Sequence, residues 1–290
     1  MQTRHRAAAT ALLLTASMAG LAAGGSSAQA TTHGHPAARA AAAPVVTITA
    51  NKGGVKLSTA KIHPGNTMFK VTGKAHGSIQ LLRLRKGYTI ADLANDIGPL
   101  MAGDPATVKR VDKKVVFYGG MAIPPAGSKP NMWGTDIDSH GTFYVINLKR
   151  NDIATFQSKG AHQTRSLPKT DGRLGMKGSE SFAAPASNPH KGWMKSANNA
   201  TQPHFIDLEQ VLKSTTNQDI EDWLNNPSGP PPFIKPGGAS TGTEVVSPGH
   251  TIVWKYHVPR GKYASFCFYP DKATGVPHAF MGMYALFDMQ

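Results

Sequence analysis

Residues 261–283, GKYASFCFYPDKATGVPHAFMGM, contain the only cysteine of this 290-residue chain, Cys267. The run that leads to Cys267 alternates in the manner of a β-strand, so we expect Cys267 to lie at the end of a strand. His278 and Met283 follow it in the pattern Cys-x10-His-x4-Met, and Met281 provides a second thioether nearby. The segment thus gathers sulfur and nitrogen donors at the end of a predicted strand.

A single cysteine excludes an intramolecular disulfide framework. The N-terminal sequence indicates an exported protein. Three interpretations of Cys267 then remain: an inert buried thiol, an intermolecular disulfide or a metal ligand. His278, Met283 and the upstream His204, in Gln202-Pro203-His204, favour the metal ligand. One thiolate, two imidazoles and one thioether form the ligand set of blue-copper electron-transfer sites, because soft sulfur favours Cu(I) and imidazole serves both oxidation states.

Residues 261–270, with a proline three positions after the cysteine, and residues 277–283 (PHAFMGM) resemble the copper loop of the cupredoxins, the type 1 copper family. This resemblance implies one type 1 copper ion, with His204, Cys267 and His278 in a trigonal plane and Met283 as the axial ligand. Over residues 175–290 the resemblance includes the ligand residues. Over residues 45–160 it is limited to the order of the predicted elements.

The chain departs from the family pattern at three points. The gap of ten residues between cysteine and histidine exceeds that of the small plastocyanin-like members. Phe205 replaces the asparagine that often follows the first histidine, so a different contact must join the two ligand loops. Met281 could compete with Met283 for the axial position.

The two halves of the chain share one order of predicted elements. In each half a histidine, His76 or His204, precedes a short strand and then a helix that opens on a threonine-based capping box. We therefore expect an all-β fold of two cupredoxin-like Greek-key β-sandwiches in tandem, each with one short inserted helix. The predicted strands are 45–50, 66–72, 79–84, 115–118 and 141–148, then 193–198, 205–208, 251–257 and 261–268, and the predicted helices are 89–100 and 216–224.

Asn147 stands where Cys267 stands in the repeat, so we expect the first sandwich to lack a copper site. A Gly/Lys/Ser-rich stretch is the expected linker between the sandwiches. The predicted organisation is 1–30 signal peptide, 31–44 flexible leader, 45–160 cupredoxin-like domain without copper, 161–178 linker and 179–290 copper-binding domain.

The N-terminus has the pattern of a secretory signal peptide. Arg4 and Arg6 precede an apolar run over 7–23, and Ala28-Gln29-Ala30 supplies a cleavage site. The alternative, a membrane anchor, is weakened by the short run and its glycines, and no later stretch is long and apolar enough to span a bilayer. We expect a secreted, extracytoplasmic protein whose new terminus, Thr31-Thr32-His33, has nitrogen donors that suit Cu(II).

Removal of the signal peptide lowers the net charge from +14 to +12, because the segment contains two arginines and no acid. The basic residues are scattered rather than clustered with aromatic residues, so nucleic acid is not expected as a partner. An acidic protein partner or an anionic cell surface fits the charge better.

Phe266 and Phe268 flank Cys267, so the histidine route that leads to a second copper centre in copper oxidases is missing, and hydrolase motifs are also missing. We therefore expect no enzyme. The prediction is an exported mononuclear type 1 copper protein that carries single electrons between redox partners. The alternatives are a secreted copper carrier or storage protein and a metal-free cupredoxin-like binding or scaffold module.

Overall fold

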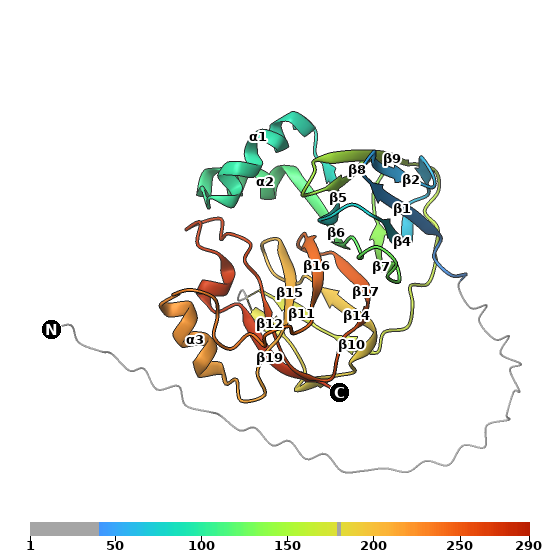
Figure 1. Ribbon diagram of the computed structural model, residues 1–290. Coiled ribbons are helices and arrows are strands. Elements are labelled where there is room, and N and C mark those ends of the chain that lie inside the picture. The colour runs from blue at the N-terminus through green and yellow to red at the C-terminus, as the bar shows by residue number, and fades with distance from the viewer. Residues whose placement is uncertain (1–40, 179–180) are drawn as a thin grey trace, which may run out of the picture. The chain divides into compact units, whose positions relative to one another are not determined.

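In the computed structural model, which describes residues 41–178 and 181–290, strands make up most of the regular structure (Figure 1). One sheet has the order β10-β14-β17-β7-β4-β1-β2, and a second has the order β13-β19-β18-β15-β16-β6-β5-β8-β9-β3. The strands of the first sheet are β10 (Gly172–Arg173), β14 (Lys191–Ala197), β17 (Thr251–His257), β7 (Asn131–Ile137), β4 (Gly65–Gly73), β1 (Val45–Asn51) and β2 (Gly54–Leu57). Those of the second are β13 (Ser187–Asn188), β19 (Tyr284–Met289), β18 (Gly261–Phe266), β15 (His204–Gln210), β16 (Ser240–Val246), β6 (Val115–Ala122), β5 (Ser78–Leu84), β8 (Gly141–Asn147), β9 (Asp152–Ser158) and β3 (Lys61–Ile62). A separate pair is formed by β11 (Gly175–Lys177) and β12 (Ser181–Ala183).

The helices begin where their capping residues predict. Thr89 caps α1 (Ile90–Met101) and Thr216 caps α3 (Asn217–Asn225), each in a complete capping box, which confirms both predicted helix starts. The first half contains two helices rather than one, because the chain turns at Gly103 and Asp104 then caps α2 (Pro105–Lys114). Pro105 at the first helical position favours this second start. A one-turn 3-10 helix, η1 (His278–Met281), lies near the C-terminus.

Both sheets run through both halves of the chain. In the first sheet β17 pairs with β7, so that Trp254 lies opposite Trp133, and in the second β16 pairs with β6 at Val246 and Tyr118. The two layers enclose a continuous core cluster in which both tryptophans are fully buried. The expectation of an all-β fold built from sandwiched sheets is confirmed, and the paired strands join the two sandwiches edge to edge.

The division of the chain into two domains stays a prediction. The expected linker, 161–178, contains β10 and β11. At the end of the expected leader, Ala43 is buried and its N–H donates to the Ser166 carbonyl at 3.0 Å. The predicted signal peptide and Thr31-Thr32-His33 lie outside the described residues.

No helix within the described residues combines the length and the apolar composition needed to cross a bilayer.

Gln80 joins the two halves through hydrogen bonds inside the second sheet. Its side-chain amide donates to the carbonyls of Gly119 and Val245, each at 3.1 Å, and its Oε1 accepts from the Val245 N–H at 3.0 Å. Gln80→Leu keeps the volume but leaves these buried groups without partners, so we expect it to lower the free energy of unfolding by about 1–3 kcal/mol. Urea unfolding measures the change.

The matched control is Gln157→Leu, because Gln157 is exposed and its side-chain amide donates to the Thr142 hydroxyl within the first half of the chain. It should change the free energy of unfolding by less than about 0.5 kcal/mol. Equal effects of the two substitutions would show that the Gln80 bridge does not stabilise the junction of the halves.

Candidate metal centre

β15 and β18 bring His204 and Cys267 to the same end of the second sheet. The two strands are antiparallel neighbours whose ladder ends at the pair Asp207 and Phe266. His204 is the first residue of β15, and Cys267 directly follows the last residue of β18. An antiparallel pair places the start of one strand beside the end of the other, so two residues 63 positions apart meet here.

Backbone hydrogen bonds hold η1 against the end of β18. The N–H of His278 donates to the Tyr269 carbonyl at 2.9 Å, and that of Ala279 donates to the Cys267 carbonyl at 2.7 Å. The N–H of Met283 donates to the His278 carbonyl at 2.9 Å, and the Met283 carbonyl accepts from the Cys267 N–H at 3.3 Å. Three of the four residues predicted as ligands are therefore linked to one another through the main chain.

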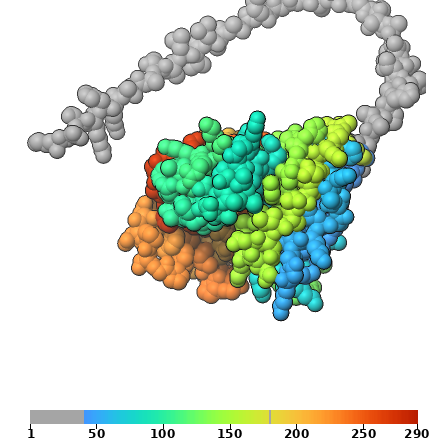
Figure 2. All heavy atoms as spheres, turned by 90° about the horizontal axis from the view of Figure 1, so that it is seen from above, coloured from blue at the N-terminus to red at the C-terminus, as the bar shows by residue number. Residues whose placement is uncertain are grey.

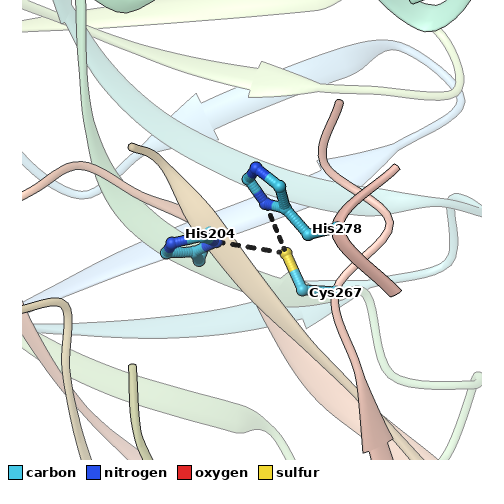
Figure 3. Close-up of side chains that lie close together, drawn as sticks. All are labelled: His204, Cys267 and His278. Carbon is cyan, nitrogen blue, oxygen red and sulfur yellow. Dashed lines mark hydrogen bonds between the residues drawn. The ribbon is translucent and has the colours of Figure 1, made fainter. Parts of the chain in front are cut away.

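The two imidazoles face the thiol of Cys267 with their Nδ1 atoms (Figure 3). The distance from Sγ is 3.5 Å to Nδ1 of His204 and 3.8 Å to Nδ1 of His278. One ligand atom from each of the three residues lies within 4.8 Å of the others, and all three residues are fully buried. The rings are inclined to each other at 56° with centroids 4.6 Å apart.

These distances suit one shared metal ion. Bonds of roughly 2.0 Å to nitrogen and 2.3 Å to sulfur, about 120° apart, would separate the two donor atoms by about 3.7 Å. The distances of 3.5 and 3.8 Å match this value without any movement of the chain. Since one thiolate and two imidazoles are ligands that copper favours, the group made by His204, Cys267 and His278 suggests copper.

The two candidate methionines have different surroundings. Met283 is fully buried in the main core cluster, which also contains Cys267. Met281 is 47% exposed, and its sulfur accepts a long contact of 4.0 Å from the Thr274 hydroxyl. Met283 is buried and is hydrogen-bonded to Cys267 through the main chain, so it is a better candidate for the thioether than the exposed Met281.

Gln202 joins the two ligand-bearing segments, a role that sequence reasoning did not find. Its amide donates to Asp271 Oδ2 at 2.8 Å, and its Oε1 accepts from the Lys272 N–H at 2.7 Å. Burial raises the pKa of Asp271, but hydrogen bonds from Gln202 and from Thr274 outweigh it and lower this pKa to about 2. The ionised carboxylate thereby ties the His204 segment to the loop before His278, in place of the missing asparagine at 205.

The turn between α1 and α2 contacts the loop that carries His278. Gly103 and Gly275 approach so closely that a Cβ on either would overlap the carbonyl oxygen of the other, and both have φ of +74°. Asp112 of α2 accepts a hydrogen bond of 2.7 Å from the Tyr269 hydroxyl, and burial together with this carboxylate raises the pKa of Tyr269 well above its usual value. In Figures 1 and 2 the teal and green helices lie beside the red C-terminal segment. The first half of the chain thus covers the metal loop of the second.

The corresponding positions of the first half differ in burial. His76, which matches His204, is exposed, and Asn147, which matches Cys267, is buried. The Asn147 side-chain oxygen accepts a hydrogen bond of 3.1 Å from the Lys149 N–H, so it stabilises the turn after β8.

No protein-family profile and no curated protein matches the chain. Among solved structures it is similar to auracyanin B, with 15% identity over 43% of this chain and 93% of that chain and a TM-score of 0.26. The auracyanin of Roseiflexus castenholzii gives 17% identity over 43% and 99%, with a TM-score of 0.25. The copper nitrite reductase of Nitrosomonas europaea gives 9% identity over 86% and 94%, with a TM-score of 0.23.

The expectation that the chain is no enzyme is contradicted, because most of the similar solved structures are nitrite reductases or multicopper oxidases, which are enzymes. Phe266 and Phe268 replace the histidines of one internal route to a second copper centre. They have no bearing on reactions of a substrate at the surface of the site.

The contact of Gly103 with Gly275 yields a test of how the metal loop is held. In Gly103→Ala the new methyl group must displace the Gly275 carbonyl, so we expect a loss of at least about 2 kcal/mol in the free energy of unfolding. Amide exchange at residues 267–278 should also become faster, which mass spectrometry can measure.

Gly87→Ala is the matched control, since Gly87 has nearly the same φ, +75°, but open space around its Cβ position. It measures the cost of the left-handed backbone alone. If both variants lose the same free energy and residues 267–278 exchange equally slowly in both, the glycine contact does not hold the loop.

Proposed function

We propose that this chain binds one copper ion in a type 1 site and transfers single electrons to or from a protein partner. The His204 and His278 imidazoles and the Cys267 thiolate would hold the ion, and Met283 would be the weak fourth ligand. The observation that carries the proposal is the convergence of three fully buried ligand atoms within 4.8 Å of one another. A bound copper ion supplies one-electron chemistry, because it alternates between Cu(II) and Cu(I).

The residues of the site are held in place before any ion arrives. The main-chain bonds between Cys267, His278 and Met283 fix three donors, and the link from Gln202 to Asp271 fixes the segment of His204. Ligands that cannot rearrange favour rapid electron transfer, since little movement accompanies a change of charge. Burial of the ligands also excludes water, which tunes the potential of a metal site.

The same burial is less suited to a copper carrier. A carrier must release its ion, and release requires that water or a competing ligand reach the donors. His204, Cys267 and His278 are each 0% exposed, and the turn of Gly103 lies against the loop before His278. Electron transfer needs no such opening.

The surface beside His278 is suited to a protein partner. Val276, Phe280 and Met281, which flank His278 along the chain, are 40%, 37% and 47% exposed. Exposed apolar side chains beside a candidate ligand offer a small contact surface, and weak redox encounters bury little area. The chain's net charge of +14 supports the further proposals of an acidic partner, of export, and of association with an anionic cell surface.

Addition of one equivalent of Cu(II) to the purified chain tests the copper site. We expect an intense visible band from charge transfer between the Cys267 thiolate and copper, and Cys267→Ser should abolish it. Met283→Leu should retain the copper but shift the band or the reduction potential, because the buried thioether is lost. Met281→Leu is the matched control and should change neither, since Met281 lies at the surface.

Two other outcomes would contradict the proposal in different ways. Copper bound without the intense band, and readily exchanged, would support a carrier or storage protein. If the chain bound no stoichiometric copper and Cys267→Ser left its stability unchanged, a metal-free binding module would remain.

The proposed acidic partner gives a salt dependence. The rate of electron exchange between the copper-loaded chain and an acidic redox protein should fall as ionic strength rises from about 10 to 300 mM, because salt screens the attraction. Stopped-flow absorbance measures the rate, and a small uncharged reductant serves as the control. A rate that rises with salt would overturn the assignment of an acidic partner.

A further inference from the structure

A cavity of about 630 Å³ lies beside the candidate metal centre. Its wall is formed by α1, by strands of the second sheet, and by the residues that directly follow two proposed ligands: Phe205 after His204, and Phe268 to Pro270 after Cys267. Most of the lining is apolar, including Leu82, Leu93, Leu100, Phe117, Phe205 and Phe268. Sites for small ligands in proteins have this size and are mostly apolar with a few polar groups.

Among the described residues, Asp207 and Glu244 are the only carboxylic acids that line the cavity, and no lysine, arginine or histidine lines it. Asp207 lies on β15 opposite Gly242 of β16, and Glu244 lies two residues further along β16, close enough that its charge contributes to the raised pKa of Asp207. Glu209 lies two residues after Asp207, on the same side of β15, and adds a third negative group. The absence of a cation from this wall contrasts with the 31 lysines and arginines of the whole chain.

The carboxylates are held in a setting that disfavours their ionisation. Burial raises the pKa of Asp207 to about 7, and the neighbouring Glu209 and Glu244 contribute to the increase. Burial also raises the pKa of Glu244, although the Ser78 hydroxyl opposes this. Like charges in an apolar wall destabilise the folded chain unless a positive group lies between them. A positively charged occupant would supply that group.

We propose that this cavity binds a small organic cation whose apolar body lies against α1 and Phe268 and whose ammonium group lies between Asp207 and Glu244. The apolar lining provides affinity through buried area, and the two carboxylates select a cation over a neutral molecule of equal shape. The site requires no metal, so it stands whether or not the copper proposal does.

Three related probes test the site: 1-naphthylmethylamine, which is cationic at neutral pH, its neutral analogue 1-naphthylmethanol, and the anion 1-naphthoate. In calorimetric titrations of the metal-free chain we expect the amine to bind with 1:1 stoichiometry. It should bind at least tenfold more tightly than the alcohol, and the anion should not bind. The copper-loaded chain should show the same order, so that failure of copper binding and failure of this site are separate results.

The variant Asp207→Asn/Glu244→Gln should bring the affinity for the amine to that for the alcohol, because it removes both charges and keeps the shape. Asp288→Asn is the matched control, since Asp288 is exposed on β19 and its loss changes the net charge without changing the cavity. Equal binding of amine and alcohol to the unaltered chain, or no saturable binding of either, would overturn the proposal.

A stability measurement tests independently whether the Asp207 carboxyl is buried beside Glu209 and Glu244. The unfolded chain ionises Asp207 near pH 4, whereas the folded chain retains the proton up to about pH 7. Stability due to the protonated carboxyl is therefore present at low pH and is lost as the pH rises through this interval. Asp207→Asn should raise the thermal midpoint at pH 8 and leave it unchanged at pH 4. A lower thermal midpoint of Asp207→Asn at pH 8 would show that Asp207 is not buried beside the charged Glu209 and Glu244.

Discussion

The candidate metal centre depends on the hydrogen bonds that close the segment from Cys267 to Met283 onto the end of β18. The Cys267 carbonyl accepts from Ala279, its N–H donates to Met283, and Met283 in turn donates to His278. These bonds pair backbone groups of buried residues, which favours this conformation of the loop. The donor atoms of Cys267 and His278 are near each other because of this closure, and the sheet then adds His204 through β15.

Much of the fold could be predicted from the sequence because it is encoded locally. The alternating runs around Val71 and Ala264 predicted strands, and the threonine capping boxes predicted the starts of α1 and α3. The ligand residues could be proposed because a lone cysteine with spaced histidine and methionine residues has few chemical interpretations. The strands β2, β7, β9, β16 and β19 and the helix α2 were among the elements missed, and β16 and α2 were missed for different reasons. β16 begins inside a Pro/Gly-rich stretch, and it becomes a strand by pairing with its neighbours on both sides. The signal for α2, Asp104 followed by Pro105, was present and was overlooked.

The contacts between the halves could not be predicted, since no local pattern specifies them. Gln80 bonds to Val245, Tyr269 bonds to Asp112, and Gly103 lies against Gly275, in each case across more than 150 residues. A repeat in sequence indicates two similar units but does not indicate that their sheets continue into each other. The same holds for Gln202 and Asp271, which meet because two ligand segments already lie side by side.

The covering of the metal loop by the first half changes how the centre can be reached. Where α1 and α2 meet the loop, the Gly103 and Gly275 backbones leave no room for even a methyl group. Residues next to the proposed ligands reach the surface in one direction and a cavity in the other. Val276, Phe280 and Met281 are exposed, and Phe205 and Phe268 line the cavity. The first is apolar and lies on a basic protein, whereas the second is mostly apolar and is lined by carboxylates without a lysine, arginine or histidine among the described residues. Partners that approach along these two directions must therefore differ in charge and in size. An acidic macromolecule is the partner proposed for the first direction and a small cation is the ligand proposed for the second, so the two proposed contacts attract charges of opposite sign.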